Sequence, residues 1–247
     1  MRRTVRHAAK TWGPPSDCWL TRSSPLRCSV LTGTVCIVSA LAHGQMKRGM
    51  HERQVSRLHV VGSNPSTAAV IDASYRRFLS AMDDLLAAQP HTLGRRPGAG
   101  DFALHGQLTQ LIGFDPTSRA IAHTVSPRTV AWVDKTEDLC GLDPTEDDWM
   151  NIEDSQDGLT ALLKEVGRVY VPAQLANARA LAAGETSWET EIDGGRWQQQ
   201  TFPYQAKCLT WTRAQYELLS EVDRRRVDNV MAGTGCEAML LPDSSLA

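Results

Sequence analysis

The sequence lacks the motifs of several common enzyme classes. It has no G-x-S-x-G nucleophile elbow, no G-x-x-x-x-G-K-[ST] phosphate loop and no G-x-G-x-x-G dinucleotide fingerprint. It also has no apolar run approaching the ~18 residues that a membrane-spanning helix needs. These absences argue against a serine hydrolase with a nucleophile elbow, a P-loop enzyme, a Rossmann-type dehydrogenase and a protein with a transmembrane helix.

The cysteines also lack the spacing of a metal or redox site. There are six of them, with no C-x-x-C pair and none within metal-chelate spacing of a His. Zinc sites and dithiol redox motifs depend on such close spacings. We therefore expect no bound metal, and reduced thiols in a cytoplasmic protein. The six are Cys18, Cys28, Cys36, Cys140, Cys208 and Cys236.

Charge is unevenly distributed along the chain. Residues 1–60 carry ten Lys or Arg and two acidic residues, a net +8, so the rest must carry −10 to give the overall −2. A basic head of this kind is typical of segments that bind nucleic acid or membranes, or that target a protein for transport. Phosphate binding, however, needs Lys and Arg gathered on one face. Because the body of the chain is acidic, we expect neither nucleic acid nor a membrane as its partner.

The first fifty residues show no regular hydrophobic pattern. Scattered Pro, Arg and Trp fit neither the period of a strand nor that of a helix. We expect residues 1–50 to be disordered, or to be no native part of the fold. An alternative stays open, because the apolar run Val30–Leu41 follows two Arg residues and ends in A-L-A, as a secretory signal does. If Val30–Ala42 is such a signal, the protein is exported.

From residue 51 onward, apolar residues recur at helical spacing. The first predicted helix ends before Pro90, and a second covers Phe102–Ile112. The second has almost no charge, so we expect it to be the central helix of the fold. A third begins at Pro127, since proline is favoured in a first helical turn, and runs to about Leu139. The apolar stripe of the first helix consists of Ile71, Tyr75, Phe78, Met82, Leu85 and Leu86.

The second half of the chain predicts more helices and one hairpin. An acidic segment, Asp143–Asp157, is either a solvated connector or a calcium loop, although it lacks the order of an EF-hand. An amphipathic helix then starts near Leu159 and is kinked or restarted at Pro172. Alternating residues around an Asp-Gly pair predict a β-hairpin near 187–201. Two more helices, near 205–219 and 221–232, complete a domain assigned to residues 51–247.

The stretch LGRRPGAGDFAL at 93–104 carries the most specific signal in the chain. With Gly98 as the cap of the second helix, Asp101 stands at its third position. There a carboxylate accepts from the free cap N–H and lies at the positive end of the helix dipole. This pattern resembles the capping box of the C-terminal domain of glutathione transferases. That family normally has Ser or Thr where this chain has Gly98, a change that costs about a few tenths of a kcal/mol.

Other phrases, in the same order, resemble a bacterial branch of that family. ASYRRFL at 73–79 precedes the capping loop, WVDKTEDL at 132–139 follows it, and FPYQAKC at 202–208 lies further on. The match covers roughly residues 54–139. It implies a mainly α fold, a glutathione-transferase C-terminal-like helical bundle with one late β-hairpin.

The resemblance implies an enzyme that conjugates glutathione, as co-substrate, to small electrophiles. The family binds glutathione in a thioredoxin-like domain that lowers the thiol pKa, because the thiolate is the nucleophile. Such a domain needs about 75–80 residues of alternating strands and helices, a pattern not seen before residue 54. We therefore assign no catalytic residue and expect little or no activity from the chain alone. The alternative is a non-catalytic helical module that binds a partner chain or hydrophobic ligand.

Three residues are candidates for the substrate pocket that the resemblance implies. His105 lies one turn into the second helix, where this branch is expected to carry an aromatic residue. It is either a pocket donor or a buried histidine bonded to a carbonyl. Tyr204 and Lys207 either line the same cleft or cap the last pair of helices. The implied partners are a small hydrophobic electrophile or ligand, with a homodimer left open.

Overall fold

The computed structural model of this chain describes residues 45–46, 48–49, 52–53, 56–154 and 157–241. Within these ranges the protein is mainly helical and has one two-stranded antiparallel hairpin. No helix in them is both long enough and apolar enough to cross a membrane. The expectations for residues 1–44, including the Val30–Ala42 segment and three of the cysteines, concern residues outside this description.

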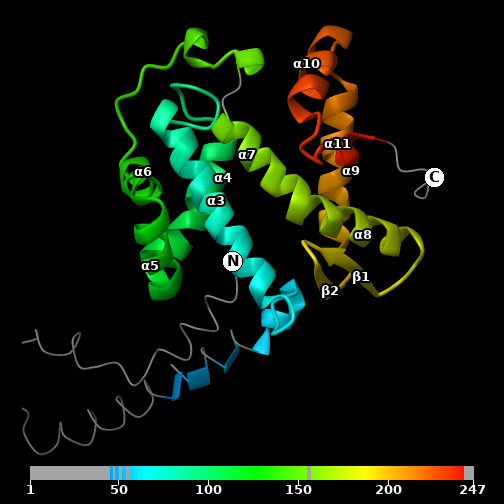
Figure 1. Ribbon diagram of the computed structural model, residues 1–247. Helices are drawn as coiled ribbons and strands as arrows, with labels where there is room; N and C mark the ends of the chain where they lie inside the picture. Colours follow the sequence, from blue (N-terminus) through cyan, green and yellow to red (C-terminus); the bar gives the residue numbers. More distant parts are fainter. Residues whose placement is uncertain (1–44, 47, 50–51, 54–55, 155–156, 242–247) are drawn as a thin grey trace, which may run out of the picture.

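The longest described helix, α3 (Ala68–Ala88), forms the centre of the fold. In Figure 1 it runs between α5 and α6 on one side and α7 on the other. It ends two residues before Pro90, as predicted, because proline disfavours helical geometry in the residue that precedes it. The predicted stripe is largely confirmed, since the buried residues of α3 are Val70, Ile71, Tyr75, Leu79, Ala81, Met82 and Leu85.

Four elements follow α3 and pack against it or against one another. They are α4 (Ala99–Leu108), the π-helix η2 (Thr109–Phe114), α5 (Pro116–Val125) and α6 (Pro127–Glu137). The predicted start of a helix at Pro127 is confirmed. With α3 they form the first core cluster, which consists of Tyr75, Leu79, Leu108, Leu111, Ile112, Ala122, Val130, Trp132 and Val133.

Side-chain caps set the starts of α5 and α6. The Asp115 carboxylate accepts from the Thr117 N–H at 2.8 Å, and the Ser126 hydroxyl accepts from the Thr129 N–H at 3.1 Å. Each helix then begins with a proline, whose missing N–H costs nothing in a first turn. The sharp corners between these short helices are therefore encoded locally.

The second predicted helix, Phe102–Ile112, is divided between α4 and η2, and its expected central place is met only in part. Leu108, Leu111 and Ile112 are buried in the first core cluster, whereas Phe102 is 54% exposed. An uncharged helix is not necessarily enclosed, because apolar atoms also make up much of a protein surface. The apolar stripe of α3 has the helical period that burial of a whole face requires, and α3 takes the central place.

The acidic segment after α6 is an exposed connector. Its two short 3-10 turns, η3 (Glu146–Asp148) and η4 (Ile152–Asp154), contain no buried residue. The chain then continues through α7 (Asp157–Glu165), the π-helical turn η5 (Val166–Tyr170) and α8 (Val171–Ala182). Pro172 stands in the first turn of α8, which confirms the predicted restart of the helix.

Helix α7 crosses α3 closely at Gly158. A Cβ atom on Gly158 would lie 2.5 Å from the backbone nitrogen of Leu85 and 2.6 Å from its Cα. Any larger residue would therefore push the two helices apart. The second core cluster spans this crossing and consists of Ala81, Met82, Leu85, Leu159 and Leu162.

The predicted hairpin is confirmed as β1 (Ser187–Ile192) and β2 (Gly195–Gln200). Its turn residues, Asp193 and Gly194, have φ angles of 51° and 75°. Positive φ at both central positions matches the twist of a two-residue hairpin. Ile192 is buried at the end of β1, so the turn also delivers an apolar residue to the interior.

Arg77 on α3 connects the hairpin to the helices. Its guanidinium lies 2.6 Å from the Glu165 carboxylate on α7 and 2.8 Å from the Asp193 carboxylate in the turn. The pairing with Glu165 is bidentate, with a second hydrogen bond of 2.9 Å. A bidentate contact of this kind fixes the relative orientation of the two side chains as well as the distance between them. One side chain therefore orients α3, α7 and the hairpin relative to one another.

Three helices follow the hairpin, namely α9 (Pro203–Glu217), α10 (Glu221–Met231) and the short α11 (Glu237–Leu240). The first two confirm the predicted pair, whereas α11 was not expected. Asn177 of α8 holds the start of α9, since it donates to the Phe202 carbonyl at 3.0 Å and accepts from the Phe202 N–H at 2.7 Å. In Figure 1 this group lies beyond α7, away from α5 and α6.

Replacing Gly158 by Ala should destabilise the protein by about 1–3 kcal/mol, the usual cost of overpacking. The added Cβ would overlap the backbone of Leu85, which cannot move aside as a side chain tip could. Urea denaturation followed by circular dichroism measures the change. Gly106→Ala on α4 is the matched control, because nothing lies within 4 Å of its Cβ position. Equal stability of the two variants would contradict the close crossing.

Candidate functional site

The predicted capping interaction at the start of α4 is present. The Asp101 carboxylate accepts from the Gly98 N–H at 2.9 Å, from the Thr92 N–H at 2.8 Å and from the Thr92 hydroxyl at 3.0 Å. Asp101 is completely buried. A buried carboxylate is stable only when hydrogen bonds replace its lost water. Asp101 therefore fastens the loop after α3 to the first turn of α4.

Trp149 packs against the cap position, close to Gly98. A Cβ on Gly98 would lie 3.3 Å from the ring of Trp149, closer than side chains usually approach. The Arg96 guanidinium lies over the same ring, 4.5 Å from its centroid. Such a cation–π contact holds the indole against the capping loop. Sequence reasoning missed Trp149, since the acidic connector around it gave no sign of packing.

Backbone pairing attaches the connector to the capping loop. The Arg95 N–H donates to the Asp148 carbonyl, and the Met150 N–H donates to the Leu93 carbonyl, both at 2.8 Å. Gly94 lies between them with a φ of 127°. A Cβ there would lie 2.5 Å from the Asp148 carbonyl oxygen, so only glycine fits. The connector is thus solvated on its outer side and anchored on its inner side.

His91 is buried beside this carboxylate. Its Nδ1 lies 4.0 Å from Asp101 Oδ1, too far for a hydrogen bond, and it has no other hydrogen-bond partner among the described residues. Burial lowers the pKa of His91 below its ordinary value, and the nearby Asp101 charge opposes this effect only in part. The folded protein therefore favours the neutral imidazole.

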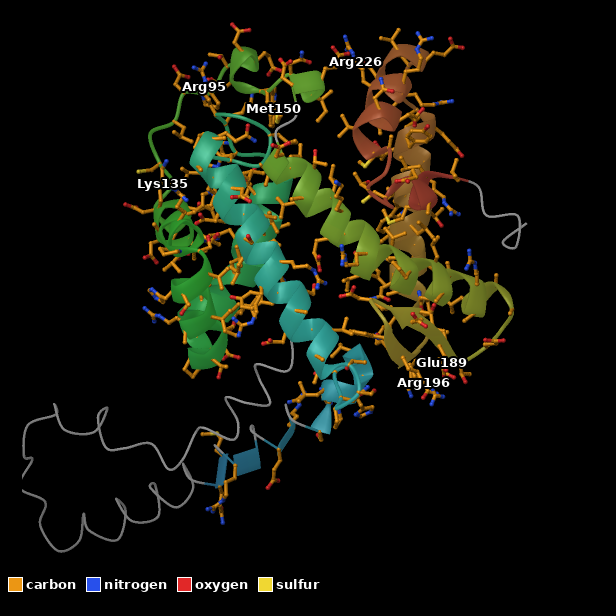
Figure 2. All side chains as sticks on the ribbon, in the orientation of Figure 1. Arg95, Lys135, Met150, Glu189, Arg196 and Arg226 are labelled. Carbon is orange, nitrogen blue, oxygen red and sulfur yellow. The ribbon has the colours of Figure 1, made fainter. Side chains whose placement is uncertain are left out.

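An open cavity of about 410 Å³ lies between the end of α3 and α6. Its walls include Trp132, Leu86 and Pro90, and the Trp132 indole N–H donates to the Pro90 carbonyl at 3.0 Å. Two cations, Arg128 and Lys135, line it as well. Arg128 is paired with an acid of α3, whereas Lys135 makes no ion pair within the described ranges and lies at the outer side of α6 in Figure 2. The hollow therefore combines apolar walls with two cationic side chains and is wide open to solvent.

The three predicted pocket residues do not meet at one site. His105 packs edge-on against Trp132, with ring centroids 6.3 Å apart, and its Nε2 lies 3.3 Å from the Glu137 carboxylate. Tyr204 and Lys207 are exposed on α9. No hydrogen bond, ion pair or ring contact joins His105 to either of them in the part of the chain that the structure describes.

Two buried groups that could ionise, a thiol and a phenol, are held in their neutral forms. Burial raises the pKa of the Cys236 thiol, which donates to the Leu163 carbonyl. Burial likewise raises the pKa of Tyr75, whose hydroxyl donates to the Ser118 carbonyl at 3.2 Å. Among the described residues, no group of three His, Cys, Asp or Glu side chains is placed to hold a metal ion.

Comparison of the chain with protein-family models, with curated proteins and with solved structures found no match.

Replacing Asp101 by Asn should lower the free energy of unfolding by about 1–3 kcal/mol. The Asn amide has one oxygen where the carboxylate has two. At least one of the Thr92 and Gly98 groups that donate to Asp101 therefore loses its acceptor. Thermal and urea denaturation measure the loss. Asp134→Asn is the control, because Asp134 is exposed on α6. A stable Asp101→Asn protein would show that the cap contributes little.

The free energy of unfolding should also fall in mild acid because of His91. Its pKa in the folded state lies below the unfolded value of about 6.5. As the pH falls, the unfolded chain therefore binds a proton at His91 before the folded chain does. The contribution of neutral His91 to the free energy of unfolding is complete above pH ~6.5 and is lost as the pH falls. Between pH ~7 and ~5, wild type should lose more unfolding free energy than His91→Gln. Parallel pH profiles for the two proteins would contradict this assignment.

Proposed function

We propose that this chain is a glutathione transferase-like helical module which forms the electrophile side of such a protein and does not activate glutathione by itself. The observation that carries the proposal is the buried Asp101 cap, with its acceptor bonds to Gly98 and Thr92. The cap stands at the residues where the sequence resembles the family. Asp101 supports the fold of the family and not a catalytic role, because its side chain is buried. It is also not among the residues that line the cavity beside Trp132.

The chemistry of conjugation explains why we propose that the chain does not activate glutathione by itself. A glutathione transferase must supply the thiolate near neutral pH, because the neutral thiol is a poor nucleophile. In the described ranges the strands form one two-stranded hairpin, and no peptide bond is cis. This part of the chain thus offers neither the larger sheet nor the cis-proline loop with which the family holds glutathione. The thiol-activating surface would have to come from elsewhere.

The full purified chain, incubated with glutathione and 1-chloro-2,4-dinitrobenzene, should show no saturable turnover above the uncatalysed rate. A two-domain glutathione transferase in the same buffer is the positive control. Retention of the chain on immobilised glutathione, without turnover, would support a binding role in the same chemistry. Saturable turnover by the chain alone would overturn the statement that it cannot activate the thiol.

A second candidate function is a non-catalytic module that binds a hydrophobic ligand or a partner chain. Two observations favour it. The cavity beside Trp132 has apolar walls with Lys135 at its edge, and α9 exposes aromatic residues to solvent. Dimerisation or ligand-induced stabilisation without retention on glutathione would favour this function over the first.

A further inference from the structure

The acidic connector between α6 and α7 is joined to the loop after α3 by few contacts besides the Trp149 indole. Two backbone hydrogen bonds of 2.8 Å cross between them, donated by the Arg95 and Met150 N–H groups at one end of the helical body in Figure 2. Two ion pairs add to these, Arg95 with Asp148 and Arg96 with Glu146. Each ion pair has a strongly exposed partner, and such pairs contribute little to stability. The connector can therefore separate from the loop more easily than the helices can unfold.

His91 lies at the centre of the loop side of this contact. Its backbone pairs with Gly94, which in turn pairs with Trp149 of the connector. Its ring is buried, and Nδ1 has no hydrogen-bond partner among the described residues. The next residue, Thr92, donates twice to the Asp101 carboxylate. A movement of His91 therefore affects both the cap of α4 and the attachment of the connector.

A second proton on the imidazole creates a donor that the closed loop does not satisfy. An imidazolium has an N–H group at both ring nitrogens, whereas His91 Nδ1 lies 4.0 Å from Asp101 Oδ1. That oxygen already accepts from the Thr92 N–H at 2.8 Å. A charge-assisted N–H···O bond is about 2.7–2.9 Å long, so the two groups would have to approach by about 1 Å. The charged ring thus either draws the carboxylate away from Thr92 or needs water, which enters only when the loop opens.

Charges from two helices act on the His91 ring in the part of the chain that the structure describes. Burial lowers the pKa of His91 most, the Asp101 charge of α4 raises it in part, and the Lys135 charge of α6 lowers it further. The last turn of α3 carries no charged residue. In the connector, hydrogen bonds from Thr145 hold the pKa of Asp148 below its ordinary value. Asp148 therefore keeps its charge in mild acid, whereas an exposed histidine takes up a proton there.

We propose that protonation of His91 releases the acidic connector from the loop after α3, so that this contact is closed at neutral pH and opens in mild acid while the helices stay folded. Opening exposes the His91 ring and the inner side of the connector to water. A solvated histidine binds a proton below about pH 6.5. The closed state therefore has its full advantage above that pH and loses it as the pH falls. This inference does not depend on glutathione, so it can fail while the proposed function holds.

Hydrogen exchange of the full chain tests the release. The Arg95 and Met150 N–H groups donate across the contact, so the peptides that contain them report its opening. Their protection, corrected for the pH dependence of intrinsic exchange, should fall several-fold between pH 7 and pH 5, but by no more than about tenfold per pH unit because one proton is taken up. The buried stretch of α3 should keep its protection. Unchanged protection at Arg95 and Met150, or an equal loss in α3, would overturn the proposal.

Replacing the histidine tests whether it is the group that responds. His91→Gln should remove the pH dependence of this protection, because glutamine does not titrate. His123→Gln is the matched control, since His123 is exposed on α5, and it should behave as wild type does. An equal fall in protection in His91→Gln would show that another group releases the connector, and the proposal would be wrong.

A charge change on α6 tests the same proposal without altering the buried ring. Lys135 is exposed, so Lys135→Met should fold even if His91→Gln does not. Removing this cation lets the closed loop tolerate an imidazolium better. The loss of protection at pH 5 should therefore be smaller than in wild type. Lys164→Met, which removes an exposed cation from α7, is the control and should change nothing. A loss in Lys135→Met as large as in wild type would contradict the assignment to His91.

Discussion

The structure around α4 depends on one buried anion. Asp101 carries a carboxylate with no access to water, and its three donors come from Thr92 and Gly98. Removing an acceptor from buried donors is costly, so the loop after α3 and the start of α4 hold each other in place. Trp149 then covers the cap, and the backbone of the acidic connector pairs with the same loop. The loop after α3, the start of α4 and the later connector thus meet around a single side chain.

The two halves of the helical body use different means of assembly. Around α3, burial of apolar residues dominates, and two core clusters share this helix. The later half relies more on specific polar contacts. Arg77 orients the hairpin through Glu165 and Asp193, and Asn177 makes two hydrogen bonds to the Phe202 backbone at the start of α9.

The candidate site shows where sequence reasoning succeeded and where it stopped. Gly98 and Asp101 were found because a helix start has a local signature. His105, Tyr204 and Lys207 were pocket candidates, with a buried histidine and a helix cap as the alternatives. The structure places His105 against Trp132 and the other two on the exposed surface of α9. A pocket joins residues from separate elements, and spacing along the chain does not say which faces meet. For the same reason, the absence of charge in α4 did not predict its exposure.

The sequence by itself determined most of the helices, the cap of α4 and the hairpin. These features depend on contacts between residues close in the chain, such as the apolar stripe of α3, the proline that opens α6, and the Asp193-Gly194 turn. The tertiary structure alone decided that α3 is central, that Trp149 closes the cap and that α9 presents Trp211 to solvent. These outcomes depend on the backbone distances between packed elements, as at Gly158 and Gly94. Such distances arise only when the whole chain has folded.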